Sequence, residues 1–174
     1  PHQQAAVYAL GGGAWGLTGA QVLHGQELSF NNLVDASAAW AVVSDFEESA
    51  VAVIKHTNPC GLASHEDVAE AYRRAYQGDP VSAYGGIVAY NRPVTLEAAE
   101  AMSPIFYEVV IASGYDPEAL EALKKKRNLR ILVVPLQEER SVNGLETRQI
   151  VGGFLMQTPD DTGDDPASWK TVTR

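Results

Sequence analysis

Lys55 and His56 stand side by side directly after a short apolar run, residues 50–54. An imidazole titrates near neutral pH and can relay a proton, and an ammonium group can stabilise a developing oxyanion. Residues 58–61 contain Pro and Gly, which favour leaving regular structure. Since adjacent strand residues point to opposite faces, the two side chains could share a pocket only where the strand ends. From chemistry alone, a surface lysine beside a turn histidine is the simpler interpretation.

A second polar segment, residues 79–86, also contains groups that suit a ligand. Tyr84 is followed by Gly85 and Gly86, and paired glycines let backbone amides approach a ligand closely. The alternative is a plain loop that leads into a strand.

Two further positions carry polar side chains in informative contexts. Residues 24–32 form a polar segment before a helix, in which Asn31 or Asn32 could cap the helix or bind a ligand amide, and capping fits the pattern better. Glu108 lies inside an otherwise apolar strand, where a buried charge is costly unless it is paired. Glu108 therefore either faces solvent or contacts a ligand.

The elements that must position these segments alternate along the chain. The predicted strands cover residues 50–54, 86–90, 107–112 and 129–134. The predicted helices cover residues 33–47, 65–77 (capped by Ser64) and 95–103, and a fourth begins at Asp116. This alternation predicts an α/β layered fold with a mixed sheet that is largely parallel in its centre.

Composition excludes several classes of function. The chain has 174 residues, 45% hydrophobic and 20% charged, which is typical of a soluble globular domain. Its net charge of −9 argues against a nucleic-acid interface, and no apolar run approaches the roughly 20 residues that span a bilayer. The single cysteine, Cys60, fits a reducing, cytoplasmic compartment.

Metal binding and the chain ends give weaker indications. Pro59-Cys60 is similar to the Pro-Cys-x-x-Cys zinc motif of nucleobase deaminases, but Ala63 replaces the second cysteine and no His-x-Glu element occurs. We therefore predict no metal. Residues 158–168 are acidic and rich in Pro and Gly, which predicts a surface loop. Both ends of the chain look truncated, so we expect a piece of a longer protein.

Several motifs occur together and in order along the chain. They are Pro1-His2-Gln3, the segment His24 to Asn32 with Asp35 to Trp40, Lys55-His56-Thr57-Asn58-Pro59-Cys60-Gly61, Asp79 to Ala89, Phe106 to Arg130, and Gly152 to Gln157. Together they resemble the AICAR transformylase domain of the bifunctional purine-biosynthesis enzymes (AICAR transformylase/IMP cyclohydrolase). The resemblance covers nearly the whole chain and favours a catalytic role for the Lys55-His56 pair.

The resemblance implies a fold and an activity. The family domain consists of two cytidine-deaminase-like subdomains, each a three-layer α/β/α arrangement, and residues 1–174 would be the first, truncated at both ends. The implied reaction transfers a formyl group from 10-formyltetrahydrofolate, the co-substrate, to the 5-amino group of AICAR, an imidazole ribonucleotide. The family also implies a homodimer in the parent enzyme.

The resemblance also implies roles for single residues. His56 would assist deprotonation of the attacking amine, and Lys55 would lie near the formyl oxygen and the departing folate nitrogen. The residues that fall where the family contacts the AICAR nucleotide are Asn32, Tyr84, Gly85 and Glu108. Three positions depart from the family pattern: Gln26 stands in place of lysine, Tyr84 in place of phenylalanine, and Ser113 in place of proline.

Two other functions stay open. The chain could be a noncatalytic half-domain that binds a nucleotide or a partner subunit, which turnover by the isolated chain would decide. A zinc deaminase is the third possibility, which stoichiometric zinc would support.

Overall fold

The fold was taken from a computed structural model, which describes residues 3–9, 16–134, 145–160, 163 and 165–173. The chain divides into two units, residues 1–137 and residues 138–174. The Pro1-His2 pair of the first motif lies outside the described residues. No helix within the described residues is long and apolar enough to cross a membrane.

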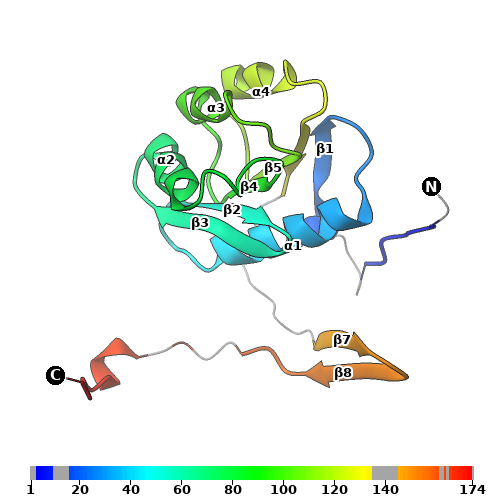
Figure 1. Cartoon of the computed structure of the whole chain (residues 1–174), viewed down its shortest axis with the longest axis vertical. Coiled ribbons are helices and arrows are strands. Elements are labelled where there is room, and N and C mark those ends of the chain that lie inside the picture. Colours follow the sequence, from blue (N-terminus) through cyan, green and yellow to red (C-terminus); the bar gives the residue numbers. More distant parts are fainter. Residues whose placement is uncertain (1–2, 10–15, 135–144, 161–162, 164, 174) are drawn as a thin grey trace. The chain divides into compact units, whose positions relative to one another are not determined.

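A six-stranded mixed sheet forms the centre of the first unit (Figure 1). In spatial order its strands are β1 (Gln21–His24), β6 (Arg130–Val133), β5 (Val109–Ala112), β4 (Ile87–Tyr90), β2 (Ala50–Lys55) and β3 (Asn58–Ser64). The pairings β4–β5 and β5–β6 are parallel, and the other three are antiparallel. The mixed sheet is confirmed, but its parallel part is confined to three strands.

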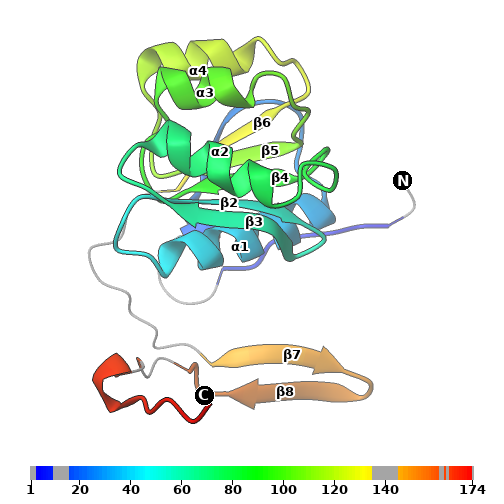
Figure 2. The same ribbon diagram turned by 60° about the vertical axis from the view of Figure 1, so that its left-hand side comes forward.

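Helices cover both faces of this sheet, which gives three α/β/α layers (Figure 2). The helix α1 (Phe30–Ser44) covers one face alone. The helices α2 (Val68–Gly78), α3 (Leu96–Met102) and α4 (Pro117–Lys124) cover the other. A short 3₁₀ turn, η1 (Gly16–Gly19), precedes β1. The expected α/β architecture is therefore present.

Small residues hold α1 against its face of the sheet. Its buried positions are Asn32, Ala36, Ala39 and Val43, which recur at the three- and four-residue spacing of one helix face. The last three pack in one cluster with Ala52, Ile54, Ile87, Ala89, Val109 and Ile111. The helix begins three residues earlier than the sequence predicted, because Ser29 caps it.

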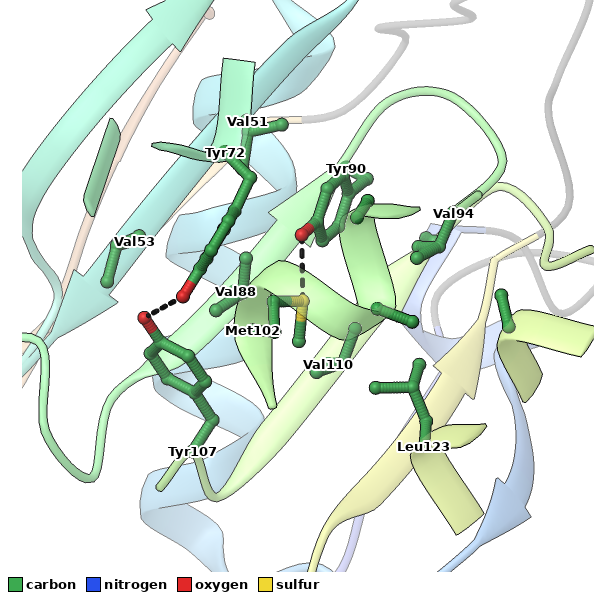
Figure 3. Packing of buried hydrophobic residues seen from close by; sticks show 14 of the residues in the cluster. Val51, Val53, Tyr72, Val88, Tyr90, Val94, Met102, Tyr107, Val110 and Leu123 are labelled. Atoms are coloured by element: carbon green, nitrogen blue, oxygen red, sulfur yellow. Dashed lines mark hydrogen bonds between the residues drawn. The ribbon is translucent and has the colours of Figure 1, made fainter. Parts of the chain in front are cut away.

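Tyrosines fill much of the opposite face (Figure 3). Tyr72 on α2 and Tyr107 before β5 are buried, and their hydroxyls lie 2.9 Å apart. Tyr90 on β4 donates its hydroxyl to the sulfur of Met102, 2.7 Å away. These bonds satisfy hydroxyls that would otherwise be costly to bury.

The strand β3 corrects the prediction that residues 58–61 leave regular structure. Residues 58–64 instead return from β2 as an antiparallel strand at the edge of the sheet. An edge strand tolerates Pro59, because one side of the strand needs no partner for its amides. The register places Val53 opposite Gly61 and Ile54 opposite Pro59, so Cys60 is an extra residue in a β-bulge.

Two other elements differ from the sequence-based expectation. The cap of α2 is Asp67, whose Oδ1 accepts the amide of Ala69 at 2.8 Å, and not Ser64, which ends β3. The strand β1 covers residues for which the sequence predicted no strand, and it pairs with the distant β6. Its pairing partner lies too far along the chain for local patterns to reveal it.

The second unit contains a hairpin formed by β7 (Glu146–Ile150) and β8 (Gly153–Gln157). Beyond it, residues 158–160, 163 and 165 have no regular structure, and a 3₁₀ turn, η2 (Pro166–Ser168), follows. The other residues of the expected acidic loop, 161–162 and 164, are outside the described residues.

Candidate active site

The N-terminal turn of α1 presents the first predicted site residue. Ser29 and Asn32 form a reciprocal capping box, in which each side chain accepts the other residue's amide at 3.1 Å. The same Asn32 side chain donates its Nδ2–H to Oε2 of Glu108, 2.6 Å away. Asn32 therefore caps the helix, as the sequence pattern favoured, and it also pairs with a carboxylate of the same chain.

Glu108 lies immediately before β5 rather than inside it. Its backbone continues the sheet bonding, because its amide donates to Gly86 and its carbonyl accepts the amide of Arg130. Its side chain is half-buried and bonded to Asn32. The charge in this apolar stretch thus has a partner, and within the part of the chain that the structure describes its second oxygen accepts no hydrogen bond.

Lys55 ends β2 and reaches the loop before β4. Its Nζ donates to the carbonyl oxygen of Tyr84 at 2.8 Å. Tyr84 is exposed, and its ring lies 5.4 Å from that of Phe106. Gly85 adopts a φ of 76°, a left-handed conformation that favours glycine, and its amide donates to Phe106.

The ammonium of Lys55 also acts on two nearby acidic groups. The pKa of Asp79 is lowered, mainly because the Ser82 hydroxyl and amide donate to its carboxylate, and the charge of Lys55 adds to this. Burial raises the pKa of the Cys60 thiol, the negative charge of Asp79 raises it further, and Lys55 opposes both. The charge of Lys55 therefore favours the ionised forms of both groups.

His56 and Thr57 form the tight turn between β2 and β3, and both have positive φ values, 53° and 62°. This left-handed conformation costs a residue with a Cβ about 1–2 kcal/mol. The carboxylate of Asp35 on α1 accepts both turn amides, from His56 at 3.3 Å and from Thr57 at 2.9 Å. The His56 carbonyl accepts the Thr57 hydroxyl and the Asn58 side-chain amide.

Lys55 and His56 are held towards different sides of the sheet, as expected from the alternation along β2. Val51 and Val53 face the tyrosine side of the sheet, and Lys55 continues that series towards the loop of Tyr84. The next residue, His56, bonds through its backbone to α1 on the other side. The strand does end at Lys55, as expected, but within the described residues the exposed imidazole makes no hydrogen bond.

All six predicted site residues lie at one end of the central strands. They gather where β2 ends and where β4 and β5 begin, because β2 runs antiparallel to β4. Direct bonds join Asn32 to Glu108 and Lys55 to Tyr84. The site residues thus lie at the carboxyl end of β2 and at the amino ends of the parallel strands β4 and β5.

Sequence patterns alone did not single out two further residues that contact this site, Asp35 and Phe106. Asp35 follows Asn32 by one helical turn, and that spacing places both on one face of α1. Phe106 gives no local signal, because its contacts with Tyr84 and Gly85 cross about twenty residues of chain. No group of three His, Cys, Asp or Glu side chains that could hold a metal occurs among the described residues.

A small hollow lies elsewhere, beside α3 and α4. Its lining residues are Met102, Ile105, Tyr107, Leu123, Lys126 and Leu129. It includes none of the predicted site residues, and its lining is largely apolar, so it offers few groups for proton transfer or carboxylate pairing.

Comparisons with known proteins place the chain in a family. Residues 1–174 match the AICARFT/IMPCHase bienzyme family. The chain is 51% identical over 178 residues to the bifunctional purine biosynthesis protein PurH of Mycobacterium marinum, covering 99% of the chain and 33% of that protein. It is 50% identical over 175 residues to PurH of a Cyanothece strain, covering 100% of the chain and 34% of that protein. The chain thus spans about one third of the length of these relatives, and it belongs to the AICARFT/IMPCHase bienzyme family.

Proposed function

We propose that this chain supplies part of a formyltransferase active site. In the proposed reaction, a formyl group passes from 10-formyltetrahydrofolate to the 5-amino group of AICAR, within de novo purine biosynthesis. The observation that carries the proposal is that one helix, α1, contacts several of the predicted residues. Its Asp35 accepts the amides of the His56 turn, and its Asn32 pairs with Glu108. The chain would form the first of two cytidine-deaminase-like subdomains in a cytoplasmic enzyme.

The chemistry assigns complementary roles to His56 and Lys55. The amine nitrogen of AICAR attacks the formyl carbon, the bond from that carbon to the folate nitrogen breaks, and the folate nitrogen takes up a proton. His56 accepts the proton that the amine loses, as a neutral imidazole can. The ammonium of Lys55 stabilises the negative charge that develops on the formyl oxygen.

The nucleotide would contact the other predicted residues. The Glu108 carboxylate is only partly used by Asn32, so it can accept a hydroxyl or amide of AICAR. Tyr84 presents an exposed ring beside Phe106, and Gly85 adds no side chain to the approach. This arrangement suits a flat base held against an aromatic surface.

The test replaces each proposed catalytic residue in a full-length bienzyme that carries this segment. We expect Lys55→Ala and His56→Ala each to lower kcat by about two orders of magnitude or more, because each removes a group that acts in the transition state. Lys124→Ala, which changes a half-exposed lysine on α4 paired with Glu121, should leave kcat near the parent value. Near-normal turnover by either variant would remove its assigned role.

A noncatalytic half-domain is the second candidate, and the length comparison favours it. The chain covers only about a third of its relatives, so further segments could complete the site, including those of a second copy in a homodimer. If the isolated chain binds AICAR but forms no product while the full-length enzyme does, the chain acts as a binding half-domain. Product formation by the isolated chain would exclude this candidate.

A further inference from the structure

The carboxylate of Asp35 joins two elements that are distant in sequence. Asp35 lies on α1, and its two oxygens accept the amides of His56 and Thr57, at 3.3 and 2.9 Å. No other described side chain accepts either amide. The contact therefore ties the β2–β3 turn to the helix that also carries Asn32.

The turn needs such a contact because its residues are poorly suited to its geometry. A two-residue hairpin with positive φ at both positions favours Asn and Gly, whereas this turn contains His56 and the β-branched Thr57. Strained backbone of this kind persists where the surrounding structure holds it, and it is concentrated at functional sites.

The bonds within the hairpin do not replace this contact. The hydroxyl of Thr57 and the side-chain amide of Asn58 both donate to the carbonyl of His56, at 2.7 and 2.8 Å. They satisfy an acceptor and leave the two amide donors without a partner inside the turn. Asp35 supplies that partner from another layer of the fold.

We propose that Asp35 is a positioning residue, which holds the strained turn so that His56 stays at a fixed place beside the substrate. The inference rests on the proposed function, because it gives a reason for fixing His56. Asp35 acts through the turn backbone and does not touch the reacting atoms.

The functional test compares variants of Asp35 in the full-length bienzyme that carries this segment. We expect Asp35→Ala to lower kcat by about 10- to 100-fold while KM for AICAR changes little, since a misplacement of about 1 Å can cost that much in rate. Asp35→Asn should lose less, because it keeps one acceptor oxygen. Alanine is the best helix former, so Asp35→Ala should not unwind α1.

A second variant distinguishes positioning from other roles. Glycine adopts positive φ without strain, so Asp35→Ala combined with Thr57→Gly should recover at least about fivefold of the lost kcat. Thr57→Gly alone should stay near the parent value. No recovery in the double variant would overturn the inference, as would an Asp35→Ala enzyme with unchanged kcat.

Hydrogen exchange gives a readout that does not depend on turnover. The amides of His56 and Thr57 should be protected in the parent and should exchange faster in Asp35→Ala. Equal exchange in both proteins would overturn the inference whatever the kinetics. The proposed function fails separately, if His56→Ala retains turnover while the exchange result holds.

Discussion

In the first unit, the two faces of the sheet pack against their helices through different kinds of side chain. On one face, α1 packs through Ala36 and Ala39, whose small side chains let the helix axis approach the strands. On the other face, Tyr72, Tyr90 and Tyr107 belong to a core that packs against three helices. On the first face the helix contributes mainly small side chains, whereas the second face contains large side chains with buried hydroxyls.

This difference matters for the site. Asn32 and Asp35, which contact the predicted site residues, both lie on the helix of the small-residue face. A close helix–sheet contact leaves few alternative positions for these side chains, because interiors are packed at crystal-like density. The tyrosine face instead stabilises the fold by burying large side chains. It contacts the site through Lys55 and the loop of Tyr84.

The largest expected effect disrupts a close backbone approach between β3 and α2, on the tyrosine face. A Cβ added at Gly61 would lie 1.8 Å from the carbonyl oxygen of Ala75, on α2. We expect Gly61→Ala to lower the free energy of unfolding by about 3 kcal/mol or more, because backbone must move apart. Urea denaturation measures this, with Gly114→Ala as control, since its nearest contact is an ordinary 3.6 Å. Equal stability of the two variants would contradict the backbone contact.

A smaller effect should test the small-residue face. Ala39→Leu adds three carbon atoms between α1 and the sheet, where Ala39 is fully buried. We expect a loss of about 1–3 kcal/mol in unfolding free energy from overpacking. The folded enzyme should also lose turnover, because α1 moves with Asn32 and Asp35. Ala41→Leu, on the exposed side of the same helix, should do neither. Normal turnover by Ala39→Leu would show that the packing of α1 does not control the geometry of the site.

The smallest effect concerns the titration of the tyrosine face. Burial raises the pKa of Tyr72 to about 12 and raises that of Tyr107 further. Above pH 10 the unfolded chain releases these protons while the folded chain retains them, so stability is full below pH 10 and falls as pH rises towards 12. Between pH 9 and pH 10 the parent should lose about 0.7 kcal/mol more than the Tyr72→Phe/Tyr107→Phe variant, about half of it from each tyrosine. Equal losses in thermal or urea unfolding would show that these tyrosines ionise freely.

Much of the fold could be predicted from local pattern. The apolar runs that became β2, β4, β5 and β6 are continuous and short, and the helices between them carry recognisable caps. The strands β1 and β3 escaped prediction for different reasons. The partner of β1 is more than a hundred residues away, and the Pro and Gly of β3 are tolerated only because the strand lies at an edge.

The sequence by itself determined the alternation of helices and strands, the residue types that suit proton transfer and carboxylate pairing, and the family resemblance. Tertiary structure decided which of these residues meet. The pairing of Asn32 with Glu108 spans 76 residues, and the bond from Asp35 to Thr57 spans 22. Such contacts depend on the antiparallel return of β2 beside β4 and on the close packing of α1, and both are set by burial of apolar side chains over the whole unit.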